Sequence, residues 1–180
     1  MDPDLTIRRV QPQDAAQVWA LRLEMLADYP LAYLQTLDQA ASKSFRLYQQ
    51  RALANSKGSE VAQFLAFAGE VLVGQVIAVA HDPAATTSTL AAVYISPQFR
   101  GRGLLCALVE AAADWSTAVG RPELVLEVVD GNDRALRAYA KLGFVVSEVG
   151  LPHPTIPGLT ETRMRRGARD LRGLPDERSV

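Results

Sequence analysis

The stretch that decides the fold runs from Leu90 to Trp115, LAAVYISPQFRGRGLLCALVEAAADW. Residues Ser88 to Ile95 are mostly β-branched, aromatic or apolar, and the short length of the run predicts a buried strand. Pro97 ends this strand because proline has no backbone N–H for a further ladder bond. After Gly103 the apolar residues recur at helical spacing. The stretch therefore predicts a strand, a glycine-rich turn and an amphipathic helix.

The turn has the features of an anion-binding site. Gly101 and Gly103 allow backbone conformations that other residues avoid. The first N–H groups of the following helix have no acceptor inside it and carry the positive end of its dipole. Such a helix start suits a phosphate or pyrophosphate, and Arg100 and Arg102 add positive charge at its rim. Many turns before helices are glycine-rich for steric reasons alone, so the turn by itself leaves both roles open.

Two well-known phosphate loops do not fit this turn. A P-loop needs Lys-Ser or Lys-Thr after its second glycine, whereas Leu104 and Leu105 follow Gly103. The dinucleotide fingerprint needs a third glycine where Cys106 stands. Residues 93–105, VYISPQFRGRGLL, instead resemble the acyl-CoA-binding segment of the GNAT superfamily of N-acetyltransferases.

The resemblance rests on two signatures. The first is Q/R-x-x-G-x-G/A, and Gln98, Gly101 and Gly103 fill its three positions. The second is N-x-x-A-x-x-x-Y followed by G-F, which residues 132–139 (NDRALRAY) and residues 143–144 match. Two motifs in the right order are far more specific than either one alone. The resemblance implies an α/β fold with a mixed, mostly antiparallel sheet and helices on both faces.

Hydrophobic patterning predicts the element order β-α-α-β-β-β-α-β-α-β-β. The expected strands are Leu5–Val10, Val61–Ala68, Val71–His81, Ser88–Ile95, Leu124–Val129, Phe144–Val149 and Thr160–Arg166. The expected helices run from Pro12 to the residue before Pro30, from Leu37 to Asn55 with Thr36 as N-cap, from Gly103 past Trp115, and from Asn132 to Gly143. We expect one GNAT-like domain over residues 1–166 and a loose, charged tail over residues 167–180.

Composition narrows the class of protein. The chain has 180 residues, of which 48% are hydrophobic and 22% charged, as in an ordinary soluble domain. The net charge of −1 gives no strong attraction to nucleic acid or anionic membranes. Cys106 is the one cysteine, so no internal disulfide can form. We expect a cytoplasmic protein without a nucleic-acid or membrane partner, and a homodimer is left open.

The resemblance assigns acetyl-CoA as the acyl donor, without a metal. Backbone amides of Arg100 to Leu105 would bind its pyrophosphate, and the edge of the strand at Val93 to Ile95 would pair with its pantetheine arm. The strand from Leu124 would diverge from that edge and leave a slot for the thioester. Asn132 is an N-cap by residue type, and by resemblance it also contacts the cofactor. The expected cofactor-binding residues are Val93, Tyr94, Ile95, Gln98, Arg100, Gly101, Arg102, Gly103, Leu104, Leu105, Asn132 and Tyr139.

Tyr139 is the expected catalytic residue. In the family this tyrosine donates a proton or a hydrogen bond to the departing sulfur of CoA. Complete proton transfer from a phenol of pKa ~10 to a thiolate of pKa ~8.5 is uphill by about 2 kcal/mol. A hydrogen bond that strengthens in the transition state is therefore the better description. The alternative is that Tyr139 only packs its helix against the sheet.

The general base is the missing part of the predicted site. Many family members carry a glutamate on the strand before the glycine-rich turn, but residues 88–95 contain no acid. Glu127 on the neighbouring strand and a chain of water molecules are the two substitutes. His81 and His153 lack further ligands at metal spacing and are interpreted as loop residues, and Cys106 as a small buried apolar residue.

The sequence thus predicts direct transfer of an acetyl group from acetyl-CoA to a primary amine in a ternary complex. The alternative is a catalytically silent acyl-CoA-binding sensor on the same fold, which the absence of the acid favours and the presence of Tyr139 opposes. The acceptor stays open between a small-molecule amine and a protein or peptide amine. Its pocket is expected around Pro30 to Leu37 and Leu151 to Gly158, because acceptor pockets are built from variable loops.

Overall fold

A single mixed sheet runs through the computed structural model, which describes residues 4–80, 82 and 84–169. Its seven strands have the order β1-β2-β3-β4-β5-β7-β6, and all neighbours are antiparallel except β4 and β5. The strands are β1 (Leu5–Arg9), β2 (Val61–Ala68), β3 (Val71–Val79), β4 (Thr87–Ile95), β5 (Glu123–Val129), β6 (Val145–Pro152) and β7 (Thr160–Gly167). The α/β fold class with a mostly antiparallel sheet is confirmed.

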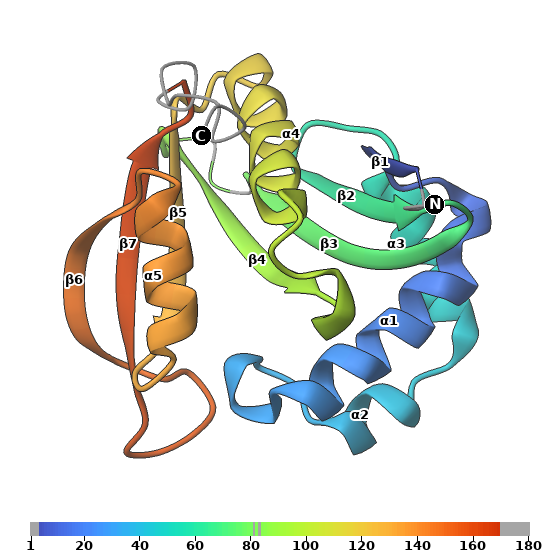
Figure 1. The fold of residues 1–180 in the computed structure, drawn as a ribbon, viewed down its shortest axis with the longest axis horizontal. Helices are drawn as coiled ribbons and strands as arrows, with labels where there is room; N and C mark the ends of the chain where they lie inside the picture. The colour runs from blue at the N-terminus through green and yellow to red at the C-terminus, as the bar shows by residue number, and fades with distance from the viewer. Residues whose placement is uncertain (1–3, 81, 83, 170–180) are drawn as a thin grey trace.

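Helices cover both faces of this sheet (Figure 1). They are α1 (Ala15–Asp28), α2 (Leu37–Ala41), α3 (Phe45–Asn55), α4 (Leu104–Ala118) and α5 (Asp133–Lys141), with short 3-10 turns η1 (Pro12–Asp14), η2 (Pro30–Ala32) and η3 (Pro97–Phe99). Alternation along β2 divides the core: Phe64 and Ala66 join the cluster under α4, whereas Leu65 and Phe67 join the cluster under α1. None of the described helices is both long and apolar enough to cross a lipid bilayer.

The predicted helix from Leu37 to Asn55 is wrong as one element, because it is two helices, α2 and α3. Thr36 does cap α2, since its side chain accepts from the backbone N–H of Gln39. The break follows at Ser42, whose hydroxyl donates to the carbonyl of Gln39 and so competes with the helical backbone bonds. Ser44 then has extended backbone and starts α3.

Strand ends also differ from the prediction. β6 continues to Pro152, so the first two residues of the loop predicted from Leu151 belong to a strand. Gly167 ends β7 and Ala168 is buried in the core, so packed structure continues past the predicted start of the tail. Residues 170–180 of that tail, and His81, lie outside the described residues.

The sheet is split between β4 and β5. The two strands pair only where Thr87 to Thr89 face Glu123 to Val125, and Figure 1 shows them diverging beyond that point. At the closed end, the buried hydroxyl of Ser116 lies 2.7 Å from both the hydroxyl of Ser88 and the carbonyl oxygen of Arg121. The divergence predicted for the strand from Leu124 is therefore present, and it opens a space in the middle of the sheet.

Candidate functional site

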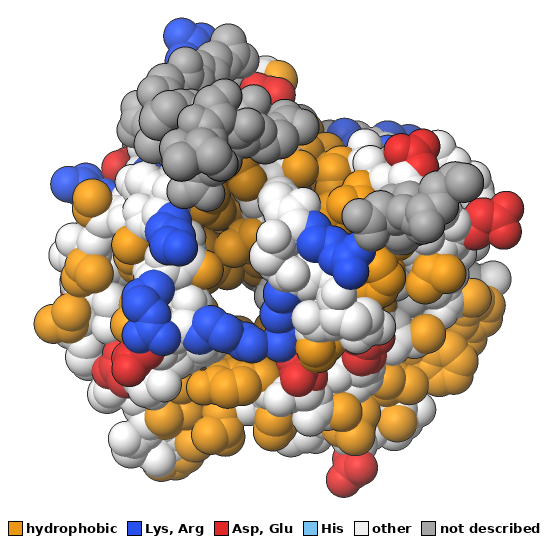
Figure 2. Space-filling view, in the orientation of Figure 1, with side chains coloured by type: hydrophobic (Ala, Val, Ile, Leu, Met, Phe, Trp, Pro, Cys, Tyr) orange, Lys and Arg blue, Asp and Glu red, His pale blue; other side chains and the backbone are white. Residues whose placement is uncertain are grey.

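A cavity of about 1760 Å³ occupies the space between the diverging strands, and we call it the cleft. Its walls come from β4, β5, α4 and α5, and from the segment that follows α1. Figure 2 shows an opening near the centre of the molecule with hydrophobic side chains inside it and Lys and Arg side chains at its edge. Eleven of the twelve predicted cofactor-binding residues line the cleft. Gln98 does not, because it is exposed on η3.

The glycine-rich turn adopts the backbone that its sequence predicts. Gly101 and Gly103 have φ of 75° and 78°, in the left-handed region that favours glycine. Gly103 is the N-cap of α4, so the N–H groups of Leu104 and Leu105 begin the helix without an acceptor one turn earlier. Both leucines line the cleft. The start of α4 therefore presents its donors and its positive dipole end to the cavity.

Arg100 is bound on the side of the turn away from α4. Its Nε donates to the carbonyl oxygen of Ile95 at 2.9 Å, its Nη2 forms an ion pair with Asp28, and its guanidinium lies 5.7 Å from the ring of Tyr94. The predicted positive charge at the rim is therefore matched by a carboxylate from the end of α1. Arg102 lies over the ring of Phe99 at 5.3 Å and also lines the cleft.

The edge of β4 that faces the cleft is irregular. Ala92 has φ of 50°, the one positive value outside glycine among the described residues, at a shift in register between β3 and β4. Such a bulge bends the strand away from its neighbour. Beyond Thr89 the strand has no ladder to β5, and the hydroxyl of Tyr33 donates to the carbonyl oxygen of Val93 at 3.3 Å. The backbone of β4 beyond Thr89 therefore lacks a neighbouring strand on the β5 side, where an extended ligand could add.

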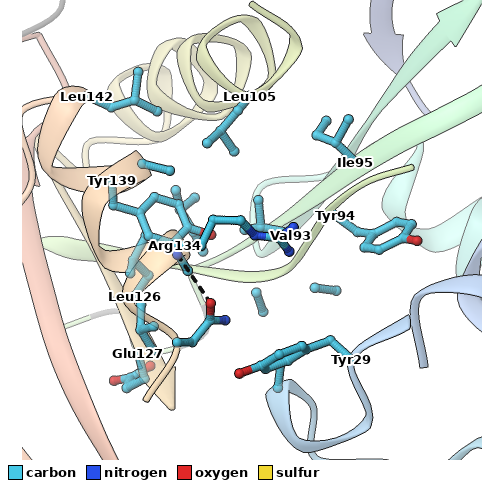
Figure 3. A pocket seen from close by; sticks show the side chains of 18 of the residues that line it. Tyr29, Val93, Tyr94, Ile95, Leu105, Leu126, Glu127, Arg134, Tyr139 and Leu142 are labelled. Carbon is cyan, nitrogen blue, oxygen red and sulfur yellow. Dashed lines mark hydrogen bonds between the residues drawn. The ribbon is translucent and has the colours of Figure 1, made fainter. Parts of the chain in front are cut away.

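Tyr139 lies on α5 with its ring packed edge-on against Phe144 at 5.7 Å. Burial raises the pKa of its phenol, and the nearby Tyr33 raises it further. The hydroxyl is therefore protonated throughout the working pH range and can act only as a hydrogen-bond donor or acid. Asn132 caps α5 as predicted, since its Oδ1 accepts from the N–H of Ala135 at 3.2 Å. Figure 3 shows Tyr139 and Arg134 of α5 facing the cavity opposite Tyr29.

Two carboxylates lie on the wall of the cleft formed by β5 and β7. Glu127 accepts from Nε of Arg163 at 2.9 Å. Glu161 is not among the site residues predicted from the sequence. Only 12% of its side chain is exposed, and it lines the cleft. Burial raises the pKa of Glu161, and the neighbouring Glu127 and Asp130 raise it too, against the effect of His153. A carboxylate with a raised pKa in a cavity is a candidate for proton transfer.

His153 supports this carboxylate from behind. The side chain of His153 is fully buried, and its Nδ1 accepts from the backbone N–H groups of Thr155 and Ile156 at 3.2 and 3.1 Å. The ring proton of the neutral imidazole must then be on Nε2, which lies 3.9 Å from Oε1 of Glu161. The predicted loop residue thus orders its loop, while its Nε2 has no hydrogen-bond partner within the described residues.

The remaining candidates carry less chemistry. Cys106 is half-buried rather than buried, and burial together with Glu110 raises the pKa of its thiol, so it is not an activated nucleophile. Both predicted acceptor segments reach the cleft, the first through Ala32, Tyr33 and Leu34 and the second through Leu151, Pro152 and Pro154. No group of three or more potential metal ligands occurs among residues 4–80, 82 and 84–169.

Comparisons with known proteins agree with this architecture. An acetyltransferase of the GNAT family from Streptococcus pneumoniae has 22% identity and a TM-score of 0.78, over 91% of this chain and 99% of that one. YncA of Salmonella typhimurium, solved with acetyl-CoA, has 18% identity and a TM-score of 0.74, over 97% and 99%. Spermidine N-acetyltransferase of Vibrio cholerae, solved with CoA and spermine, has 20% identity and a TM-score of 0.66, over 91% and 95%. At these identities the similarity shows the fold.

No curated protein matches the sequence. The model of the acetyltransferase (GNAT) family, in contrast, matches residues 21–144. That range contains the second half of α1, β4, the glycine-rich turn, α4 and α5 with Tyr139, and it is more than half of the chain. The chain therefore belongs to the GNAT family of acetyltransferases, enzymes whose acetyl donor is acetyl-CoA.

Proposed function

We propose that this protein transfers the acetyl group of acetyl-CoA directly to a primary amine of a small acceptor, both substrates being bound in the cleft at once. The observation that carries the proposal is the continuity of the cavity. It extends from the glycine-rich turn, between β4 and β5 past Tyr139, to the aromatic wall formed by Tyr29 and Tyr33. A donor and an acceptor can therefore meet without an acetylated intermediate on the protein.

Each part of the cleft has a role in this proposal. The N–H groups at the start of α4 bind the pyrophosphate of CoA, as helix N-termini bind anions. The irregular edge of β4 from Val93 to Ile95 pairs with the pantetheine arm, like a strand added to a sheet. The slot between β4 and β5 then holds the thioester beside Tyr139, whose protonated hydroxyl donates to the sulfur as the C–S bond breaks.

The amine must lose a proton for this reaction. An alkyl amine of pKa ~10.4 is almost fully protonated at pH 7, and presenting its neutral form costs about 4.6 kcal/mol. Glu161 is the better placed proton acceptor, because Glu127 already accepts from Arg163. The acid that is missing from β4 is thus replaced from β7, on the opposite side of the slot.

The acceptor class is supported by similarity as well as by chemistry. A protein of this fold has been solved with CoA and spermine, a compound with primary amines. The lining of the cleft here includes Tyr29, Tyr33, Pro152 and Pro154, and a concave, partly aromatic site favours a small amine over a folded protein surface.

The test is release of CoA from acetyl-CoA against a broad panel of small amines, with acetyl-CoA binding measured in parallel from the shift in melting temperature. Turnover of at least one amine by the wild-type protein, lost with Tyr139→Phe at unchanged acetyl-CoA binding, is the expected result. Binding of acetyl-CoA without turnover of any amine would favour the silent sensor instead. Absence of any acetyl-CoA binding would contradict both.

A further inference from the structure

Arg22 is a cation in the cleft, and its hydrogen bonds with the described residues are all to uncharged groups. Its side chain comes from α1, is half-buried and lines the cavity. Nε and Nη2 donate to Oε1 of Gln35 at 3.3 and 3.1 Å, and Nη1 contacts Sδ of Met25 at 3.7 Å. All of these acceptors are neutral. Within the described part of the chain, no carboxylate forms an ion pair with Arg22.

The surroundings of Arg22 make this lack of an anion costly. Burial lowers the pKa of its guanidinium, and the nearby Arg51 lowers it further, against the effect of Tyr48 and Tyr33. Buried charges in proteins are normally paired, because their desolvation is otherwise uncompensated. The amide Nε2 of Gln35 is also buried and has no hydrogen-bond partner within the described residues. A half-buried cation that lines the cleft is therefore bonded to an amide whose buried Nε2 has no partner within the described residues.

The other charges in the cleft do not supply the anion. Asp28 is paired with Arg100, and Glu127 with Arg163. The basic side chains that line the cleft outnumber the acidic ones: Arg22, Arg100, Arg102, Arg134, Lys141 and Arg163 against Asp28, Glu110, Glu127 and Glu161. Close to Arg22 itself, a cationic group of an acceptor would be repelled, whereas an anionic group would be attracted.

Tyr33 connects Arg22 with the reaction centre. The guanidinium of Arg22 lies over the ring of Tyr33, 5.5 Å from its centroid. The hydroxyl of Tyr33 donates to the carbonyl oxygen of Val93 on the edge of β4, and Tyr33 is close enough to Tyr139 to raise its pKa. Tyr33 thus contacts both Arg22 and the edge of β4, along which the donor is proposed to bind.

We propose that the acceptor is a small amine that also carries a carboxylate, such as a free amino acid, and that Arg22 binds this carboxylate while the amine faces the thioester. One guanidinium matches the single charge of a carboxylate, and its N–H groups supply the donors. The inference rests on the proposed acetyl transfer and adds the class of acceptor to it.

The experiment compares matched acceptors. CoA release from acetyl-CoA is measured with a panel of free L-amino acids, with the C-terminal amides of the same amino acids, and with spermidine. Each amide keeps the side chain and the α-amine but lacks the carboxylate; because amidation also lowers the pKa of the α-amine, the rates are compared per concentration of neutral amine. We expect kcat/KM to be roughly 10–100-fold higher for the best amino acid than for its amide or for spermidine, as befits a charged hydrogen-bonded pair.

Variants then assign the preference to Arg22. Arg22→Gln should raise KM for that amino acid roughly 10–100-fold, leave the amide unchanged, and so abolish the preference. Arg22→Lys should keep part of it, because the charge remains but the planar pair of donors is lost. Arg46→Gln, a charge loss at an exposed position of α3 outside the cleft, should have no effect. The acetyl-CoA melting shift should be the same in all four proteins.

Binding of the same amino acids and amides to the CoA-loaded protein, measured by calorimetry, keeps the inference testable if no acceptor is turned over. Amino-acid binding that is lost with Arg22→Gln, but without turnover, would support the carboxylate site and contradict the enzymatic function. Turnover of amides or spermidine as fast as the amino acids, an equal loss for acid and amide in Arg22→Gln, or amino-acid binding unaffected by that variant would overturn the inference.

Discussion

At the scale of single residues, the role of the Tyr139 hydroxyl can be tested directly by one substitution. Tyr139→Phe keeps the packing against Phe144 and removes only the donor to the leaving sulfur. We expect turnover to fall roughly 10- to 1000-fold, at or below the usual range for general acid catalysis. Acetyl-CoA affinity should stay within about twofold, since the bond strengthens only in the transition state. Single-turnover kinetics would measure the chemical step.

Tyr48→Phe is the matched control for this variant. Tyr48 is also a buried tyrosine, whose hydroxyl donates to the carbonyl of Ala40 at 3.4 Å, but it does not line the cleft. Its loss should cost about 1 kcal/mol of stability without changing turnover. Equal turnover in Tyr139→Phe and Tyr48→Phe would return Tyr139 to a packing role.

The two carboxylates of the cleft wall should differ in their effects on the pH profile. We expect kcat/KM to rise from pH 6 to about 9 in the wild-type protein, as the fraction of neutral amine grows. Glu161→Gln should lower kcat/KM a hundredfold or more at pH 7, whereas Glu127→Gln should lower it only modestly, because Arg163 already occupies the oxygen of Glu127. Equal effects of the two variants, or none, would mean that water carries the proton.

Glu161→Gln should also change the free energy of unfolding. It should lower activity but make the folded protein more stable at pH 7. The folded protein raises the pKa of Glu161, so it favours the protonated form, and the stability that this group contributes is lost as pH rises through its folded pKa. At pH 7 the charged carboxylate is therefore unfavourable, and the glutamine variant should be more stable than the wild-type protein. Urea denaturation at pH 4 and pH 7 measures this: the gain should appear at pH 7 and shrink at pH 4.

At the scale of secondary-structure elements, the turn before α4 is the part that similarity and geometry both assign to the phosphates. Gly103→Ala forces an alanine into the left-handed region, at a cost of about 1–2 kcal/mol, but its Cβ would meet nothing within 4 Å. The fold should survive while the N–H groups of α4 shift. We expect the melting shift at acetyl-CoA concentrations ~100-fold above Kd, worth about 2.7 kcal/mol and roughly 5–10 °C, to disappear.

Gly58→Ala controls for the backbone strain alone. Gly58 has φ of 96° and an equally open surrounding, in the loop before β2 and outside the cleft. It should lower the melting temperature about as much as Gly103→Ala while leaving the acetyl-CoA shift intact. If Gly103→Ala retained the full shift, the phosphates would have to bind elsewhere.

What could be predicted from the sequence follows from how local each feature is. The turn at Gly101 and Gly103 and the cap at Asn132 depend on backbone geometry within a few residues, so their patterns predicted them. The break between α2 and α3 depends on a competing hydroxyl bond of Ser42, which periodicity does not detect. The candidacy of Glu161 for proton transfer depends on its burial and on its closeness to His153. Neither of these follows from the residues next to Glu161 in the sequence.

Sequence patterns do not predict contacts between residues that are far apart in the chain. Arg100 lies 72 positions from Asp28, with which it pairs, and the arginine signal alone suggested a phosphate contact instead. The sequence places Arg22 only within the helix predicted before Pro30, and the folded protein shows that no ion pair among the described residues involves it. Residues that act through long-range neighbours therefore need the structure.

At the scale of the whole molecule, the split sheet has a consequence for how the protein unfolds. β5 and β7 pair along seven residues, but β4 and β5 pair along only three, so the backbone bonds that cross the middle of the sheet are few. The last three strands with α5 should then open as a cooperative unit at a lower free energy than β2 and β3, as partial unfolding units do in native proteins.

Hydrogen exchange under native conditions measures this difference. Amides of β7 should exchange through a partial opening that depends weakly on denaturant, and amides of β2 only through global unfolding. A bound acetyl-CoA would join the two parts where the backbone does not, and at ~100-fold above Kd it should slow exchange in β7 by about a hundredfold. Equal opening free energies in β2 and β7 without ligand would mean that the side chains packed under α4, and not the ladder, hold the halves together. Bound acetyl-CoA would therefore make the two parts of the sheet unfold together, in addition to supplying the acetyl group.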